Sequence, residues 1–135
     1  MPARRAWTWI GALLMFAAVV LLAAGYRNAT ADPLVRRLTL VVPGYPKTAV
    51  PVRVLLFSDV HVHGPDMPPS RVARIVEQIN ALHPDVVVAA GDFTGNSLIG
   101  SHYPVADALA PLARLKATYG VYAVLGNNDC NNRIR

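Results

Sequence analysis

Hydrophobic residues gather in a few segments of this chain, and the spacing within each segment predicts an element. Residues 6–26 form one apolar run without a polar face, about 20 residues long, which is the length of a membrane-spanning helix. Three shorter runs, at 52–57, 86–90 and 121–125, are rich in valine and bounded by polar or turn-forming residues. Continuous apolar runs of this length predict strands that are buried on both faces of a sheet.

Two helices are predicted between these strands. From 72 to 79, apolar residues recur at intervals of three and four, Ser70 is a candidate N-cap, and His83-Pro84 ends the pattern. Residues 105–115 predict a second helix, which an internal proline weakens. Strand and helix therefore alternate, which predicts an α/β fold with a mostly parallel sheet and right-handed crossovers.

The segment ahead of the first predicted strand has a different character. Residues 28–33 have the composition of a linker, and the partly alternating residues 37–42 predict an edge strand that ends in a turn at 43–46. We therefore expect three parts: 1–31 as a signal anchor or signal peptide, 32–51 as a linker with an edge strand, and 52–135 as a globular domain.

Charge around the apolar run predicts an exported domain. Arg4 and Arg5 precede the run and favour a cytoplasmic N-terminus, although arginines beyond the run weaken this rule. A cleaved signal peptide is the alternative, because Ala29-Thr30-Ala31 fits a small-x-small cleavage pattern. The length of the run favours an uncleaved anchor and hence a single-pass membrane protein with its domain on the extracytoplasmic side. Cleavage would instead give an exported soluble protein.

Composition narrows the function classes. The 135 residues carry a net charge of +5, but the arginines are dispersed and form no basic stripe with interleaved aromatic residues. We therefore expect no nucleic-acid-binding surface. The single cysteine, Cys130, excludes both an intramolecular disulfide framework and a cysteine-rich zinc site. Neither feature predicts an oligomeric state.

Polar strings follow the three predicted strands: Asp59-Val60-His61, Gly91-Asp92 and Gly126-Asn127-Asn128-Asp129. In a parallel α/β sheet, ligands bind beyond the carboxyl ends of the strands. Carboxylates, an imidazole and an amide oxygen in one place suit divalent ions such as Mn, Fe or Zn. Each string by itself also fits an ordinary turn. Together they predict a metal site, and two ions that share one aspartate would form a centre for phosphoester hydrolysis.

The order and spacing of these strings resemble the calcineurin-like metallophosphoesterase family, whose blocks read D-x-H, G-D-x-x-D and G-N-H-D/E. The resemblance runs from about Val52 to Asp129. It implies the N-terminal half of the family's α/β sandwich (βαβαβ, mostly parallel sheet) within 52–135, and two divalent metal ions. By resemblance, Asp59 and His61 bind the first ion, Asp92 bridges both ions, Asn127 gives its amide oxygen to the second ion, and Asp129 has a structural role beside them.

The sequence departs from the family pattern at two positions. Asn128 stands where the family usually has a catalytic histidine, so we expect it to occupy the catalytic position while supplying no titratable proton at physiological pH. Lower turnover, or a substrate with a good leaving group, would follow. Gly95 stands where the family usually has a second aspartate. His63 matches no family ligand position and is expected to have a surface or capping role, with the mouth of the site as its alternative place.

The resemblance implies a metal-dependent phosphoester hydrolase that activates water against a phosphomonoester or phosphodiester. A membrane-anchored form suggests a membrane lipid or a nucleotide-linked substrate. The family also uses later histidines in a G-H-x-H block, which does not occur in these 135 residues. We therefore expect the N-terminal part of a longer protein. The alternatives are a truncated, catalytically incompetent remnant that binds metal, and a membrane-tethered α/β binding module.

Overall fold

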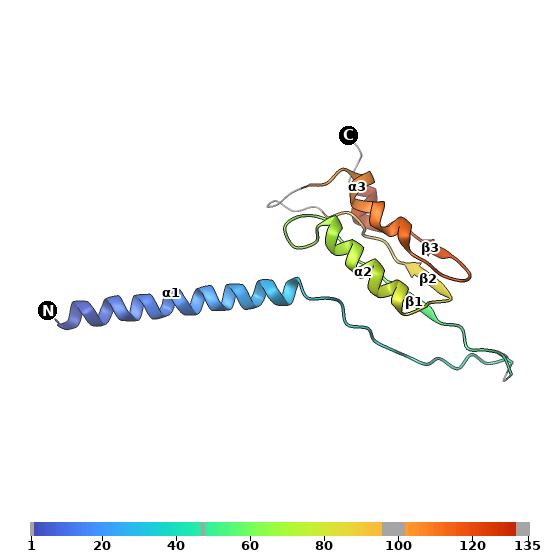
Figure 1. Cartoon of the computed structure of the whole chain (residues 1–135), viewed down its shortest axis with the longest axis horizontal. Helices are drawn as coiled ribbons and strands as arrows, with labels where there is room; N and C mark the ends of the chain where they lie inside the picture. Colours follow the sequence, from blue (N-terminus) through green and yellow to red (C-terminus); the bar gives the residue numbers. More distant parts are fainter. Residues whose placement is uncertain (1, 47, 96–101, 132–135) are drawn as a thin grey trace. The chain divides into compact units, whose positions relative to one another are not determined.

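The computed structural model describes residues 2–46, 48–95 and 102–131, and it divides the chain into two compact units, 1–32 and 33–135. The elements, shown in Figure 1, are α1 (Pro2–Ala29), β1 (Val54–Phe57), α2 (Pro69–Ala81), β2 (Val86–Ala89), α3 (Val105–Leu109), the 3₁₀ helix η1 (Ala110–Arg114), β3 (Val121–Ala123) and α4 (Asn127–Asn131).

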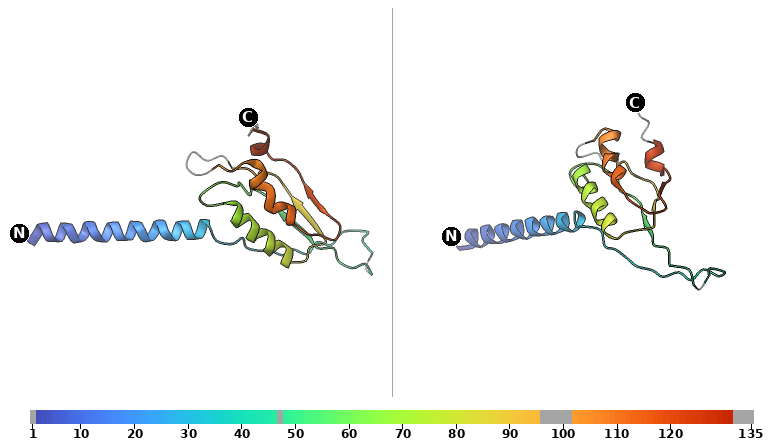
Figure 2. Two further views of the ribbon diagram at one scale, coloured as in Figure 1. Left: turned by 45° about the horizontal axis from the view of Figure 1, so that its top comes forward. Right: turned by 45° about the vertical axis from the view of Figure 1, so that its right-hand side comes forward.

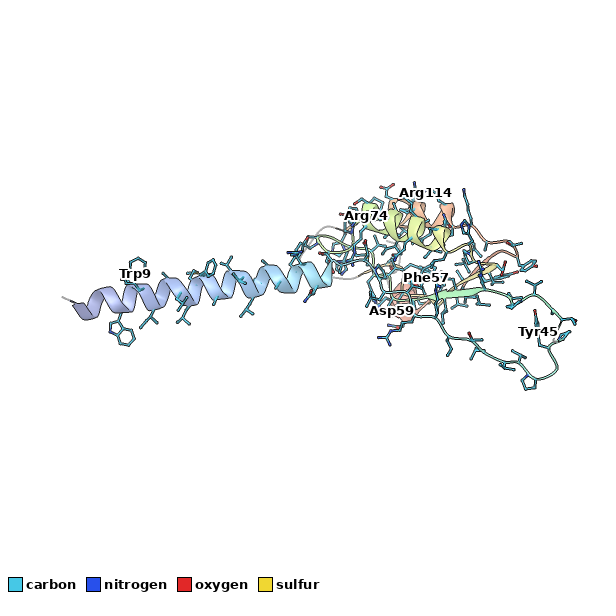
Figure 3. All side chains as sticks on the ribbon, turned by 60° about the horizontal axis from the view of Figure 1, so that its bottom comes forward. Trp9, Tyr45, Phe57, Asp59, Arg74 and Arg114 are labelled. Carbon is cyan, nitrogen blue, oxygen red and sulfur yellow. The ribbon has the colours of Figure 1, made fainter. Side chains whose placement is uncertain are left out.

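The first unit is the helix α1. Its segment Trp7–Ala29, 23 residues, is long and apolar enough to cross a bilayer, a property that signal sequences share. Its large apolar side chains are exposed along its length, as Trp9 illustrates in Figure 3. Trp7 and Trp9 lie near one end of this segment and Tyr26 near the other. Aromatic residues at both ends are typical of helices that meet two membrane–water interfaces.

The second unit is built on a parallel sheet in the order β1-β2-β3. Val54 pairs with Val86 and Phe57 with Ala89, while Val88 pairs with Tyr122. The predicted α/β class, the parallel sheet and the three strands are therefore confirmed, each strand being slightly shorter than its apolar run. All three strands point the same way, so the loops that follow them lie at one edge of the sheet.

The helix α2 lies where the 3.6-residue period predicts it, but its cap differs from the prediction. The residue before the helix is Pro68, with an extended backbone, and Pro69 is the first helical residue. A proline suits this position because its fixed φ is helical and its missing N–H would have no partner there. Ser70 is therefore inside the first turn and is not the N-cap. The helix ends one residue before Leu82.

The predicted helix 105–115 is divided in two. The α-helix α3 ends at Leu109, and the tighter turn η1 continues to Arg114 with Pro111 near its start. Because proline has no N–H and its ring crowds the preceding turn, it interrupts the α-helical hydrogen bonds. The interpretation of Pro111 as a weak point was right, and its effect is a change of helix type.

Besides the cap at Ser70, one local prediction was wrong. Residues 37–42 form no strand, because in the described part of the chain no partner strand lies beside them to accept their hydrogen bonds. The turn after them is present: the Tyr45 N–H donates to Val42 O (3.1 Å), and Figure 3 shows Tyr45 at the tip of this segment. The string after β3, for which an ordinary turn was the alternative to a ligand role, contains the short helix α4.

The core of the second unit lies on one face of the sheet. Val72 and Val76 of α2 are fully buried and pack with Ala89 and with the buried residues of the loops after β1 and β2. Figure 2 shows α2 and α3 together on that side of the strands. The described residues leave the opposite face uncovered: the register places Leu56, Val88 and Tyr122 in one row, and Leu56 and Tyr122 are exposed.

Candidate metal centre

The loops after β1 and β2 run side by side and continue the pairing of the strands. The Asp59 N–H donates to Gly91 O (3.1 Å), and the His61 N–H donates to Asp92 O (3.0 Å). The Val62 N–H then donates to Phe93 O (2.8 Å). These backbone hydrogen bonds hold the first two polar strings at a fixed distance from each other. The strand ends therefore meet as the sequence predicts.

The backbone of these loops is strained at the residues that carry the chemistry. Among the described residues other than glycine, positive φ occurs at Asp59 (55°), His61 (46°), Asp92 (55°) and His83 (50°). A left-handed conformation at such residues costs on the order of 1 kcal/mol each, and it is common at functional sites. Extended backbone, in which residues two apart point to the same side, is therefore not what brings Asp59 and His61 together.

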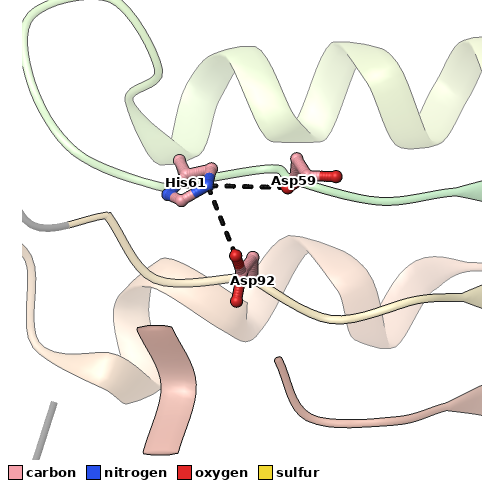
Figure 4. Close-up of side chains that lie close together, drawn as sticks. All are labelled: Asp59, His61 and Asp92. Atoms are coloured by element: carbon pink, nitrogen blue, oxygen red, sulfur yellow. Dashed lines mark ion pairs between the residues drawn. The ribbon is translucent and has the colours of Figure 1, made fainter. Parts of the chain in front are cut away.

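The two left-handed residues nevertheless bring three side chains together (Figure 4). Donor atoms of Asp59, His61 and Asp92 all lie within 4.8 Å of one another. His61 Nε2 is 3.8 Å from Asp59 Oδ1 and 3.7 Å from Asp92 Oδ2. The Asp92 side chain is only 13% exposed, against 65% for Asp59, so the group opens to solvent on the Asp59 side.

The donor set fits a divalent cation. Metal–ligand distances of about 2.0–2.2 Å place neighbouring ligands roughly 3.0–3.4 Å apart, slightly closer than the distances from His61 Nε2 to the two carboxylates. Those distances are also too long for hydrogen bonds. In the described part of the chain, no Lys or Arg forms an ion pair with Asp59 or Asp92. Two carboxylates beside one imidazole therefore carry negative charge that a cation would offset.

The third polar string closes over Asp92 because two glycines allow a close approach. Gly91 has a φ of +84°, and a Cβ there would lie 2.7 Å from Gly126 Cα. A Cβ on Gly126 would overlap the Asp92 carboxylate and lie 2.5 Å from the Asp92 nitrogen. Any side chain at either position would therefore push the loop after β3 away from Asp92.

Asn128 contacts Asp92 directly. Its backbone N–H donates to Asp92 Oδ1 (3.0 Å), and its side-chain Nδ2 donates to Asp92 Oδ2 (2.9 Å). Sequence reasoning did not anticipate this contact. Asn127, the first residue of α4, is exposed and directly precedes Asn128.

Asp129 joins the loops after β2 and β3. Its Oδ2 accepts from the N–H groups of Asp92 (2.8 Å) and Gly126 (2.9 Å). Its Oδ1 accepts from the N–H groups of Phe93 (2.9 Å) and Thr94 (3.0 Å), and from Thr94 Oγ1 (3.3 Å). Burial by itself raises the pKa of Asp129, but the four backbone donors outweigh burial and hold the pKa below its ordinary value.

At Gly95, where the sequence departs from the family pattern, neighbouring atoms leave no room for a side chain. A Cβ at Gly95 would overlap the His63 ring and lie 2.8 Å from His61 O. The His63 side chain is 20% exposed, and its Nδ1 lies 2.9 Å from Asp66 Oδ1. His63 therefore fills the space that a side chain at 95 would need. This compensation was not visible in the sequence, because 32 residues separate the two positions.

Comparison with known proteins agrees with this geometry. The protein-family model described as calcineurin-like phosphoesterase matches residues 52–135, more than half of the chain. The chain belongs to this family. The family is metal-dependent, and the match covers all three strands and the three polar strings.

Similar proteins include a Caenorhabditis elegans protein named as a metallophosphoesterase, 34% identical over 117 residues. Proteins named "Transmembrane protein with metallophosphoesterase domain" are 34% identical over 117 residues in Danio rerio and 30% identical over 118 residues in Bos taurus. In each case 87% of this chain is covered, but only 23% of the C. elegans protein and 26% of the other two. The chain thus spans about a quarter of the length of these relatives. No solved structure matches it significantly.

Proposed function

We propose that this chain carries the first ligands of a metal-dependent phosphoester hydrolase that is anchored to a membrane. The observation that carries the proposal is the convergence of Asp59, His61 and Asp92 on strained loops at the carboxyl edge of the sheet. Membership of the calcineurin-like phosphoesterase family supports the same chemistry.

In this proposal five residues of the three strings each have one role. Asp59 and His61 would hold one divalent ion, Asp92 would be a ligand shared with a second ion, and Asn127 would offer its amide oxygen to that second ion. Asp129 fixes the loop that carries Asp92 through its four backbone bonds. When bound, such ions make water a stronger nucleophile and neutralise charge on the phosphate oxygens. Mn, Fe or Zn suit this mixture of carboxylate and imidazole ligands.

The anchor and the substrate belong to the proposal as well. The apolar helix Trp7–Ala29, with arginines before it, supports a single-pass protein whose domain lies on the extracytoplasmic side. The names of the Danio rerio and Bos taurus relatives support a membrane location. A domain held at a membrane surface favours membrane lipids or nucleotide-linked lipids as substrates, with a phosphomonoester or phosphodiester as the bond that is cleaved.

The test compares the full chain in detergent micelles with Asp92→Asn. We expect the wild-type chain to bind Mn²⁺ and Asp92→Asn to bind it at least about tenfold more weakly, because the buried ligand loses its charge. The matched control is Asp107→Asn, which changes an aspartate in α3 outside the site. Isothermal titration with Mn²⁺ measures binding, and p-nitrophenyl phosphate and bis-p-nitrophenyl phosphate report hydrolysis. Equal Mn²⁺ affinity in the wild type and Asp92→Asn would refute the ligand assignment.

A second candidate function is metal binding without turnover. Asn128 in the place of a histidine and Gly95 in the place of an aspartate favour it, because neither residue supplies a titratable group. The same experiment separates the two candidates. Mn²⁺ binding that depends on Asp92, without hydrolysis of either nitrophenyl ester, would support the binding function for this chain.

A further inference from the structure

We propose that Asn128 is a positioning residue, which acts by holding the Asp92 carboxylate in the orientation needed to ligate metal. The inference rests on the proposed function, because it assigns the role of a neighbour of a proposed ligand. It differs from the expectation that residue 128 acts on the substrate. The observation that carries it is the pair of hydrogen bonds from one asparagine to the two oxygens of one carboxylate.

The two bonds fix the plane of the carboxylate. The backbone N–H of Asn128 holds Oδ1 at 3.0 Å and its Nδ2 holds Oδ2 at 2.9 Å, so Asp92 cannot rotate about its last bond without breaking both. Gly126 also lies against this carboxylate, so close to Asp92 that it could not carry a Cβ. The string that follows β3 therefore contacts Asp92 through both Asn128 and Gly126.

The geometry leaves Asp92 free to bind ions. A carboxylate has about four lone-pair sites, and Asn128 occupies one on each oxygen, so each oxygen keeps one site for a cation. Oδ2, which accepts the Asn128 side-chain bond, is also the oxygen that lies 3.7 Å from His61 Nε2. The bond from the Asn128 amide therefore fixes the orientation of Oδ2. The remaining lone pair of Oδ2 then faces the His61 side of the site.

The same contact uses the side-chain donor of Asn128. Its Nδ2 group donates directly to the Asp92 carboxylate, which is largely buried. Hydrogen-bond partners of ligating carboxylates commonly alter metal affinity by tenfold to a hundredfold, roughly, when they are removed. A residue that acted only on the substrate would leave metal affinity unchanged.

The experiment measures Mn²⁺ affinity by isothermal titration of the metal-free full chain in detergent micelles. Asn128→Leu keeps the volume but removes the side-chain donor, and Asn128→Asp replaces the donor with an acceptor. We expect both to weaken binding by about tenfold or more. Asn128→His should retain affinity within about threefold, because an imidazole Nδ1–H can donate from the same place.

Asn80→Leu is the matched control. The Asn80 amide also joins two segments, through bonds to Arg114 O (2.9 Å) and the Lys116 N–H (2.9 Å), but it lies on α2 away from the three ligands. We expect Asn80→Leu to leave Mn²⁺ affinity unchanged. Hydrogen exchange of residues 92–94 in each metal-free variant shows whether the loop after β2 is still folded, because the N–H groups of these residues donate to Asp129, which no variant changes.

Three outcomes would overturn the inference. Unchanged Mn²⁺ affinity in a folded Asn128→Leu would show that the side-chain bond does not matter to the metal. Tighter binding by Asn128→Asp would show that residue 128 is itself a ligand. No Mn²⁺ binding by the wild-type chain would refute the proposed function and the inference with it. This result is distinguishable from the other two because it is seen before any substitution is made.

Discussion

Asp129 makes the largest testable contribution to the shape of the site, because one carboxylate accepts from four backbone N–H groups on two loops. The substitution Asp129→Asn keeps the size of the side chain and turns one oxygen into an NH₂ group. Whichever way the amide turns, two of the four N–H groups then face another donor. Either the N–H groups of Asp92 and Gly126 or those of Phe93 and Thr94 then lose their acceptor.

The magnitude follows from the number of bonds. A hydrogen bond to a charged group contributes about 1.5–3 kcal/mol, so two lost bonds would cost about 3–6 kcal/mol in a fully buried setting. Asp129 is only partly buried, which moves the expected loss toward about 3 kcal/mol. Total stabilities of domains are about 5–15 kcal/mol, so a loss of this size would be easily measured.

The assay is urea unfolding of the full chain in detergent micelles, followed by pulse proteolysis, with hydrogen exchange of residues 92–94 as the local readout. The control is Asp85→Asn, because Asp85 accepts a single backbone bond, from the Arg53 N–H (2.8 Å), and an amide can turn its oxygen toward that donor. We expect Asp85→Asn to cost less than about 1 kcal/mol. If Asp129→Asn costs no more than Asp85→Asn, and exchange at 92–94 is unchanged, the reasoning about Asp129 is wrong.

Two further predictions use the same unfolding assay. Because the pKa of folded Asp129 lies below that of the unfolded chain, the unfolded state binds the proton more tightly. The stabilisation is therefore present above about pH 4 and is lost as the pH falls through the lowered pKa, and Asp129→Asn should remove this part of the pH dependence. Val87→Ala should lower the free energy of unfolding by about 1–3 kcal/mol, because Val87 is fully buried. Val54→Ala should lower it by less than about 0.5 kcal/mol, because Val54 is 62% exposed on the open face of the sheet. Equal losses would show that this face is covered in solution.

The elements that depend on local pattern could be predicted from the sequence. Valine-rich runs gave the three strands, and the spacing of apolar residues gave α2, because periodicity reports which face of an element is buried. The two wrong local predictions have different causes. A strand at 37–42 needs a partner strand, which a single-segment pattern does not contain. A cap at Ser70 would start the helix two residues after its observed start at Pro69, because proline is itself a favourable first helical residue.

The sequence also determined which residues meet, because the carboxyl ends of parallel strands share one edge of the sheet. Asp59, His61 and Asp92 could be named in advance for that reason. Only the tertiary structure decided how they meet: through left-handed backbone at all three residues, with Asn128 bonded to Asp92 and with His63 filling the space beside Gly95. These contacts join positions more than 30 residues apart, and such contacts depend on the exact approach of two loops rather than on the pattern within either one.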